Sequence, residues 1–179
     1  MKDLETKNLK IRKFKLKDAK DVYENLATEK RLQNCLGYTV HKNLEETKIM
    51  INSYINEYNM DELVWAIEEK ESASVIGYIK AVEISYTNKI CKLKFGIGFK
   101  FIDKHYIEEA LREVLDYLFK EKNFNIIVSE FYDGCEVISK IKSNVLEAVG
   151  MEKEAVLRNR KINHKTGIAE NKVIYSIIK

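Results

Sequence analysis

Apolar and polar residues alternate with a period of two near the start of the chain and then change to a helical period. Residues 8–14 (NLKIRKF) alternate apolar and basic side chains, which predicts a strand. The helical spacing that follows is carried by Leu16, Ala19, Val22, Tyr23 and Leu26. The first part of the chain is therefore predicted to be a strand followed by a helix.

A second amphipathic helix is predicted over residues 43–59, after a loop at residues 32–42. Its apolar face comprises Leu44, Ile51, Tyr54, Ile55 and Tyr58. Asn43 can cap its N-terminus, and Glu46 three residues later resembles the acidic member of a capping box.

Three strand-like stretches come next, separated by short polar turns. They are LVWAIEEK, SVIGYIKAVEI and KICKLKFGIGF, within residues 63–99. Connections this short join antiparallel strands, so the three stretches predict a meander.

The clearest helical stripe in the chain follows this meander. It contains Ile107, Ala110, Leu111, Val114, Leu115 and Leu118. Residues 125–131 then return as a strand, and a helical crossover of this kind favours parallel pairing. A last helix over residues 137–149 can end at Gly150, and strands near 151–162 and 170–178 complete the chain. The predicted order is β-α-α-β-β-β-α-β-α-β-β, an α+β fold with a mixed central sheet flanked by helices.

Composition narrows the class of protein. The chain has 179 residues, 45% hydrophobic and 33% charged, so we expect a single domain over residues 1–179. The first ten residues are too polar for a signal peptide, and no apolar run is long enough to span a membrane. The 31 basic and 28 acidic side chains are interspersed, which argues against a nucleic-acid partner. We expect a cytoplasmic protein with no membrane or nucleic-acid partner, and the oligomeric state, including a homodimer, stays open.

Neither metal nor cysteine chemistry is indicated. The three cysteines, Cys35, Cys91 and Cys135, are widely spaced and lack a CxxC pair, so no disulfide framework or zinc site is expected. Cys135 is interpreted as an inert thiol, since no histidine lies near it in sequence. His41 and His164 have no partner at ligand spacing, so no metal cofactor is expected.

The segment FGIGFKFIDKHYIEEAL, residues 95–111, has features of an anion site. Gly96 and Gly98 share one face of the strand, and this bare face either marks a bulge or leaves room for a ligand against the backbone. The helix that follows offers free N–H groups and a partial positive charge.

An ordered set of phrases runs along nearly the whole chain. They are LKIRKFKLKDAKDVYENL, NLEETKIMINSYINEY, VWAIEEK, VIGYIKAV, EEALREVLDYLF, VLEAVGMEKEAVLR and VIYSIIK. Together with the predicted order, this set resembles the GNAT acyl-CoA-dependent N-acetyltransferases, and more narrowly the Rim-type branch that acetylates ribosomal-protein N-termini and other amines.

The resemblance implies a position for acetyl-CoA as co-substrate. The strand backbone at Phe95, Ile97, Gly98 and Phe99 would hold the pantetheine, and the loop that follows would cradle the pyrophosphate. In that loop Lys100 matches the basic position, Asp103 and His105 replace the two small residues, and Lys104 lies between them.

Other family positions also differ in this chain. Lys92 stands where the family often has a glutamate that acts as general base. Glu83 on the neighbouring strand is therefore the candidate catalytic base. The alternative interpretation is that Glu83 is a solvated charge at the end of a strand. In place of the family's Asn-x-x-Ser the chain has Ser139 and Lys142, and Ser143 lies one residue out of register.

Two functions therefore follow from the sequence. The first is acetyl transfer from acetyl-CoA to a primary amine, either a protein N-terminus or a small amine, by direct attack in a ternary complex. The second is a non-catalytic relative that binds a ligand or protein, because Asp103 either repels a phosphate or caps the helix whose N–H groups a phosphate needs.

Overall fold

A computed structural model describes residues 1–29, 40–57, 63–164 and 166–179. Its centre is a mixed sheet in the order β1-β2-β3-β4-β5-β6-β8-β7. The strands are β1 (Leu4–Glu5), β2 (Leu9–Arg12), β3 (Leu63–Glu69), β4 (Ser74–Ser85), β5 (Ile90–Ile97), β6 (Ile126–Tyr132), β7 (Glu152–Ile162) and β8 (Ala169–Ile178). The predicted order of elements is confirmed, with the short β1 as an addition.

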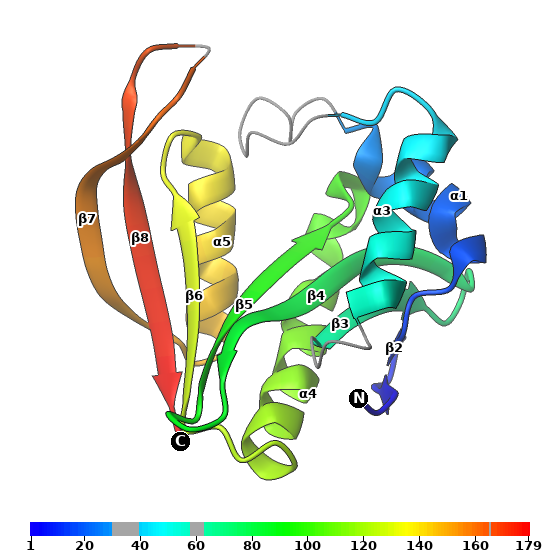
Figure 1. The fold of residues 1–179 in the computed structure, drawn as a ribbon, viewed down its shortest axis with the longest axis horizontal. Helices are drawn as coiled ribbons and strands as arrows, with labels where there is room; N and C mark the ends of the chain where they lie inside the picture. The colour runs from blue at the N-terminus through cyan, green and yellow to red at the C-terminus, as the bar shows by residue number, and fades with distance from the viewer. Residues whose placement is uncertain (30–39, 58–62, 165) are drawn as a thin grey trace.

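Helices cover both faces of this sheet (Figure 1). The first helical region is split into η1 (Leu16–Asp18), α1 (Ala19–Val22) and a π-helical turn η2 (Tyr23–Ala27). The others are α3 (Leu44–Glu57), the 3-10 helix η4 (Phe99–Lys104), α4 (Tyr106–Lys120) and α5 (Glu136–Ala148). Helices α1 and α3 pack on one face around Phe14, Ile51 and Val64. Helices α4 and α5 pack on the other face around Trp65, Leu111 and Leu146.

Helix ends follow the signals in the sequence. The Glu46 N–H donates to Asn43 Oδ1 at 3.0 Å, and the Glu46 carboxylate accepts from the Lys42 N–H at 2.9 Å, so the predicted cap of α3 is confirmed. Gly150, at φ +88°, follows α5 as predicted, since glycine adopts positive φ without a steric penalty.

The meander and the crossover also pair as predicted. Strands β3, β4 and β5 are antiparallel to one another, and β5 is parallel to β6. The parallel ladder extends only from Ile90↔Ile126 to Leu93↔Ser129, although both strands continue for several residues. Figure 1 shows the two strands separating toward their C-terminal ends. We call this opening the fork.

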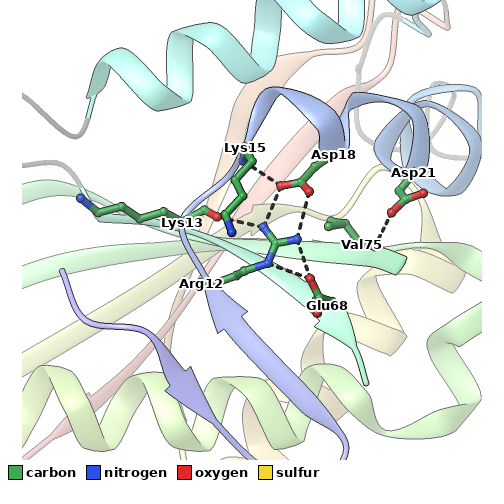
Figure 2. A network of polar contacts seen from close by, with 7 residues as sticks. All are labelled: Arg12, Lys13, Lys15, Asp18, Asp21, Glu68 and Val75. Atoms are coloured by element: carbon green, nitrogen blue, oxygen red, sulfur yellow. Dashed lines mark hydrogen bonds and ion pairs between the residues drawn. The ribbon is translucent and has the colours of Figure 1, made fainter. Parts of the chain in front are cut away.

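A buried ion network fixes the first helical region to the sheet (Figure 2). The Arg12 guanidinium binds both oxygens of Asp18, at 2.8 and 2.9 Å, and its Nε donates to Glu68 Oε2 at 2.8 Å. Asp18 also accepts the Lys15 N–H. Arg12 lies on β2, Asp18 on η1 and Glu68 on β3, so the network holds the start of α1 beside the sheet.

Candidate active site

A cavity of about 130 Å³ lies at the fork. Its walls come from both sides of the sheet. On one side they include Phe14, Met50, Tyr54 and Tyr78, and on the other side Ile107, Ile141, Lys142 and Val145. Phe95, Gly96 and Ile97 of β5 lie between these two sets. The cavity therefore connects the α1/α3 side with the α4/α5 side through the opening between β5 and β6.

The β5 strand has one edge without a ladder partner in the fork. Phe95, Gly96 and Ile97 pair with β4 on one edge, whereas pairing with β6 ends at Leu93. Phe95 and Ile97, both predicted to hold pantetheine, line the cavity. An extended ligand can lie along such an edge and hydrogen-bond to the backbone, as an added strand does.

Gly96 in β5 and Gly98 directly after it have a different role from the ligand space that their bare face suggested. A Cβ at Gly96 would stand 2.7 Å from Tyr78 Cε1, and one at Gly98 would stand 2.6 Å from the Asn25 carbonyl oxygen. The Gly98 N–H also donates to the Ile76 carbonyl at 2.8 Å. Close packing of Tyr78 and of η2 against the strand thus explains both glycines.

The loop after β5 is a 3-10 helix rather than an open glycine-rich turn. Phe99 and Lys100 begin η4, and the Lys100 ammonium lies 5.0 Å from the centre of the Phe101 ring. Asp103 is exposed, and no side chain among the described residues caps the N-terminus of α4. The expectation that Asp103 caps this helix is therefore wrong, and the first N–H groups of α4 are not used by a side chain.

Two basic side chains of this loop, Lys104 and His105, contact acidic partners. Lys104 forms an ion pair of 2.9 Å with Glu69, which raises the pKa of Lys104 and lowers the pKa of Glu69. His105 adopts φ +55° immediately before α4, and its Nδ1 lies 3.0 Å from Glu108 Oε1, a contact that raises the pKa of His105. A left-handed residue at this place fits the family's preference for a small residue there.

Helix α5 supplies the polar groups beside the fork. Lys142 lines the cavity, with its ammonium 5.9 Å from the Phe95 ring centre and 5.7 Å from that of Phe131. Burial lowers the pKa of Lys142 to about 8. Ser139 Oγ is buried with no hydrogen-bond partner within the described residues. Ser143 contacts the Tyr175 hydroxyl, whose pKa is raised by burial and by Glu147.

Glu83, the candidate base, lies near the far end of β4 and is not among the residues that line the cavity. It forms an ion pair of 2.6 Å with Lys92, whose second partner is Glu130 at 3.4 Å. These contacts raise the pKa of Lys92. The structure therefore separates Glu83 and Lys92 from the predicted cofactor-binding residues.

Lys142 was not among the site residues predicted from the sequence. The available signal was its place in the segment that matches the family's Asn-x-x-Ser.

The cysteines and histidines form no metal site in the described part of the chain. Burial raises the pKa of the free Cys91 thiol to about 12. Cys135 is disulfide-bonded, so its interpretation as an inert thiol is wrong. Cys35 and most of the predicted loop at residues 32–42 lie outside the described residues.

Comparison with protein families decides the class of this site. The model of the acetyltransferase (GNAT) domain matches residues 8–152. The chain belongs to the GNAT acetyltransferase family. No curated protein sequence matches it. In this GNAT protein, no helix of the described residues has the length and apolar character needed to cross a membrane.

Solved structures of other acetyltransferases share the fold of this GNAT chain. The ribosomal-protein-S5-alanine acetyltransferase from Vibrio fischeri superposes with a TM-score of 0.82 at 17% identity, covering 99% of this chain and 97% of that one. A GNAT-family acetyltransferase from Bacillus anthracis superposes with a TM-score of 0.80 at 21% identity, covering 99% of this chain and 98% of that one. RimL, a ribosomal L7/L12 α-N-protein acetyltransferase in complex with coenzyme A, superposes with a TM-score of 0.83 at 13% identity, covering 99% of this chain and 98% of that one. The predicted GNAT fold is confirmed, and two of these three structural neighbours are Rim-type acetyltransferases.

Proposed function

We propose that this GNAT protein transfers an acetyl group from acetyl-CoA to a primary amine, either a protein N-terminus or a small amine, by direct attack in a ternary complex. The observation that carries the proposal is the cavity that passes through the sheet at the fork. Since residues from both sides of the sheet line this cavity, a thioester that approaches from one side and an amine that approaches from the other can meet in it.

The residues present fit acetyl-CoA in two respects. The free edge of β5 at Phe95 and Ile97 suits the amide groups of pantetheine. The N-terminus of α4 lacks a side-chain cap, so its N–H groups and partial positive charge suit a pyrophosphate. The predicted contacts of Gly98, Phe99, Lys100, Asp103, Lys104, His105 and Ser143 belong to this proposal.

Acetyl transfer mainly requires the protein to position the amine next to the thioester carbonyl. The neutral amine attacks the thioester carbonyl, the C–S bond breaks, and the thiolate that leaves takes up the proton that the amine loses. Backbone N–H groups on the free edge of β5 are suited to donate to the oxygen that becomes negative during attack. Glu83 stays the predicted base, with the role of taking the proton from the substrate ammonium before attack, and Glu83→Gln tests it by comparing kcat and kcat/KM of the variant with those of the wild type.

Calorimetric titration of acetyl-CoA and CoA into the protein at low salt tests the proposal, followed by turnover of the bound thioester against amines. Binding at micromolar concentration and release of CoA that depends on an amine would support it. Absence of binding at millimolar acetyl-CoA would reject it.

A second candidate is a non-catalytic GNAT-fold protein that binds another ligand or a protein. It is favoured by the ion pair of Lys104 with Glu69 and by two acidic side chains, Asp103 in η4 and Glu108 in the first turn of α4. Replacing Asp103 and His105 together with glycine separates the two. A large gain in CoA affinity would indicate a cradle blocked by these side chains, and no change would favour a repurposed site.

The remaining expectations belong to the same proposal. We place the protein in the cytoplasm, with residues 1–179 as one domain. Its partner is a small-molecule or peptide amine, without nucleic acid, membrane or metal.

A further inference from the structure

Lys142 is a basic side chain that lines the cavity at the fork. It extends from α5 toward Phe95 on β5 and Phe131 on β6, and its ammonium lies within 6 Å of both ring centres. Phe131 is buried in the core, and Phe95 packs against the same cluster. The amine of Lys142 therefore lies at the mouth of the fork, on the wall of the cavity that passes through the sheet.

The surroundings of Lys142 disfavour its charged form. No ion pair or hydrogen bond of Lys142 occurs within the part of the chain that the structure describes, and the two aromatic rings supply only weak cation–π attraction. With burial as the cause, its pKa falls to about 8, so a substantial fraction is neutral at slightly alkaline pH. A neutral amine is a nucleophile, whereas an ammonium is not.

We propose that Lys142 is a self-acetylation site, modified by an acyl thioester bound in the fork. The proposal rests on the proposed function, because the thioester must occupy the cavity beside β5. The Nζ lone pair attacks the acetyl carbonyl carbon and forms a C–N bond. The C–S bond then breaks, and the proton lost by Nζ goes to the departing thiolate. The products are an ε-N-acetyl amide on Lys142 and a free thiol.

The product suits the site better than the reactant does. An amide carries no charge, so acetylation removes the cost of an ammonium without a counter-ion in an apolar cavity. It also adds an acetyl group to a cavity of about 130 Å³, which leaves less room for a second thioester. We therefore expect the modification to stop at one acetyl group for each chain.

Lys140 is a matched control on the same helix, because it is exposed and lies two residues before Lys142. The test incubates the full-length protein with acetyl-CoA at pH 8, without an acceptor amine, and measures acetylation of both lysines by peptide mass spectrometry. An amine of pKa about 8 has roughly 100-fold more neutral form at pH 8 than an ordinary lysine of pKa near 10.4. We expect Lys142 to be acetylated faster than Lys140 by a factor of this order, and excess CoA to suppress acetylation of Lys142 alone.

Two variants and a pH series complete the test. Lys142→Arg keeps the charge but removes the nucleophile, so the added acetyl group should be lost, whereas Lys140→Arg should leave it in place. The rate at Lys142 should rise with a midpoint near pH 8. These measurements on the wild-type chain remain decisive if Lys142→Arg fails to fold, which its circular dichroism would reveal.

The outcomes separate this inference from the proposed function. If calorimetry detects acetyl-CoA binding but Lys142 stays unmodified, or reacts no faster than Lys140, this inference is wrong and the proposed function stands. If acetyl-CoA neither binds nor modifies Lys142, both are wrong.

Discussion

The Ser129 hydroxyl on β6 donates a hydrogen bond of 3.1 Å to the Leu93 carbonyl oxygen on β5. These two residues form the last pair of the parallel ladder, beyond which the strands separate. The contact is buried, so the hydroxyl satisfies a carbonyl that water does not reach. Ser129 thus closes the narrow end of the fork, and its side chain helps to fix where the opening begins.

Replacing Ser129 with alanine tests the importance of this closure. The variant leaves the Leu93 carbonyl without its partner in a buried place, so we expect unfolding in urea to show a loss of about 1–3 kcal/mol. Ser53→Ala is the matched control, because Ser53 Oγ donates to the Met50 carbonyl in an exposed part of α3. That control should change stability by less than about 0.5 kcal/mol. Equal effects of the two variants would contradict a special role for Ser129.

Gly96 and Tyr78 form a cross-strand pair in which the ring occupies the space of a missing side chain. Gly96→Ala would force the Tyr78 ring away from the strand, since the new Cβ would stand 2.7 Å from Cε1. We expect a loss of about 1–3 kcal/mol in the free energy of unfolding. Because both residues line the cavity, we also expect weaker acetyl-CoA binding by calorimetry.

A double-mutant cycle identifies the cause of that loss. If the clash with the ring is responsible, Tyr78→Ala should abolish most of the additional cost of Gly96→Ala. If the losses of unfolding free energy in the two single variants simply add in the double variant, the backbone conformation at Gly96, and not the clash with the ring, requires the glycine.

The sequence predicted the fold well because the pattern of apolar residues sets which face of each element is buried. Trp65 and Leu111 are buried as their patterns indicated, and Asn43 caps α3 through a local contact. The details of the site depend on contacts between distant segments, which a pattern does not carry. Tyr78 against Gly96 is such a contact, and so is the approach of Lys142 to Phe95 and Phe131.

Charged residues of the site illustrate the same limit. Lys104 matched a loop position next to a phosphate, but its ammonium pairs with Glu69 at the end of β3. Glu83 was the candidate base because it lies on the strand next to the missing glutamate, and the structure pairs it with Lys92, the residue that takes the glutamate's position. In both cases the partner belongs to another element of the fold, and the two residues meet only in the folded chain.

His105 lies in the left-handed region at φ +55°, where a side chain is unfavourable. We expect His105→Gly to stabilise the protein by about 1 kcal/mol in thermal unfolding, because glycine adopts this conformation without the steric cost. It also removes a bulky group from the N-terminus of α4, so CoA affinity should rise in a calorimetric titration. Asn123→Gly is the control, since Asn123 has φ +57° beyond the other end of α4 and does not line the cavity. A rise in CoA affinity in both variants would mean that general stabilisation, and not the cradle, is responsible.

The lowered pKa of Lys142 should make the free energy of unfolding depend on pH in the alkaline range. Its pKa is about 8 in the folded protein and near 10.4 in an unfolded chain, so the unfolded state binds more protons between these values. The free energy of unfolding should therefore rise as pH increases from about 8 to 10.4, and below pH 8 the full cost of the buried ammonium is present.

Lys142→Met removes this titration and keeps an apolar chain of similar length. At pH 7 the variant should be more stable than the wild type by up to about 3 kcal/mol, and the difference should disappear toward pH 10.4. Urea unfolding at several pH values measures it, with Lys140→Met as the exposed control that changes little at any pH. A Lys142→Met variant that is less stable at pH 7 would mean that the ammonium has a counter-ion in the folded chain, and the amine would then be a poor nucleophile.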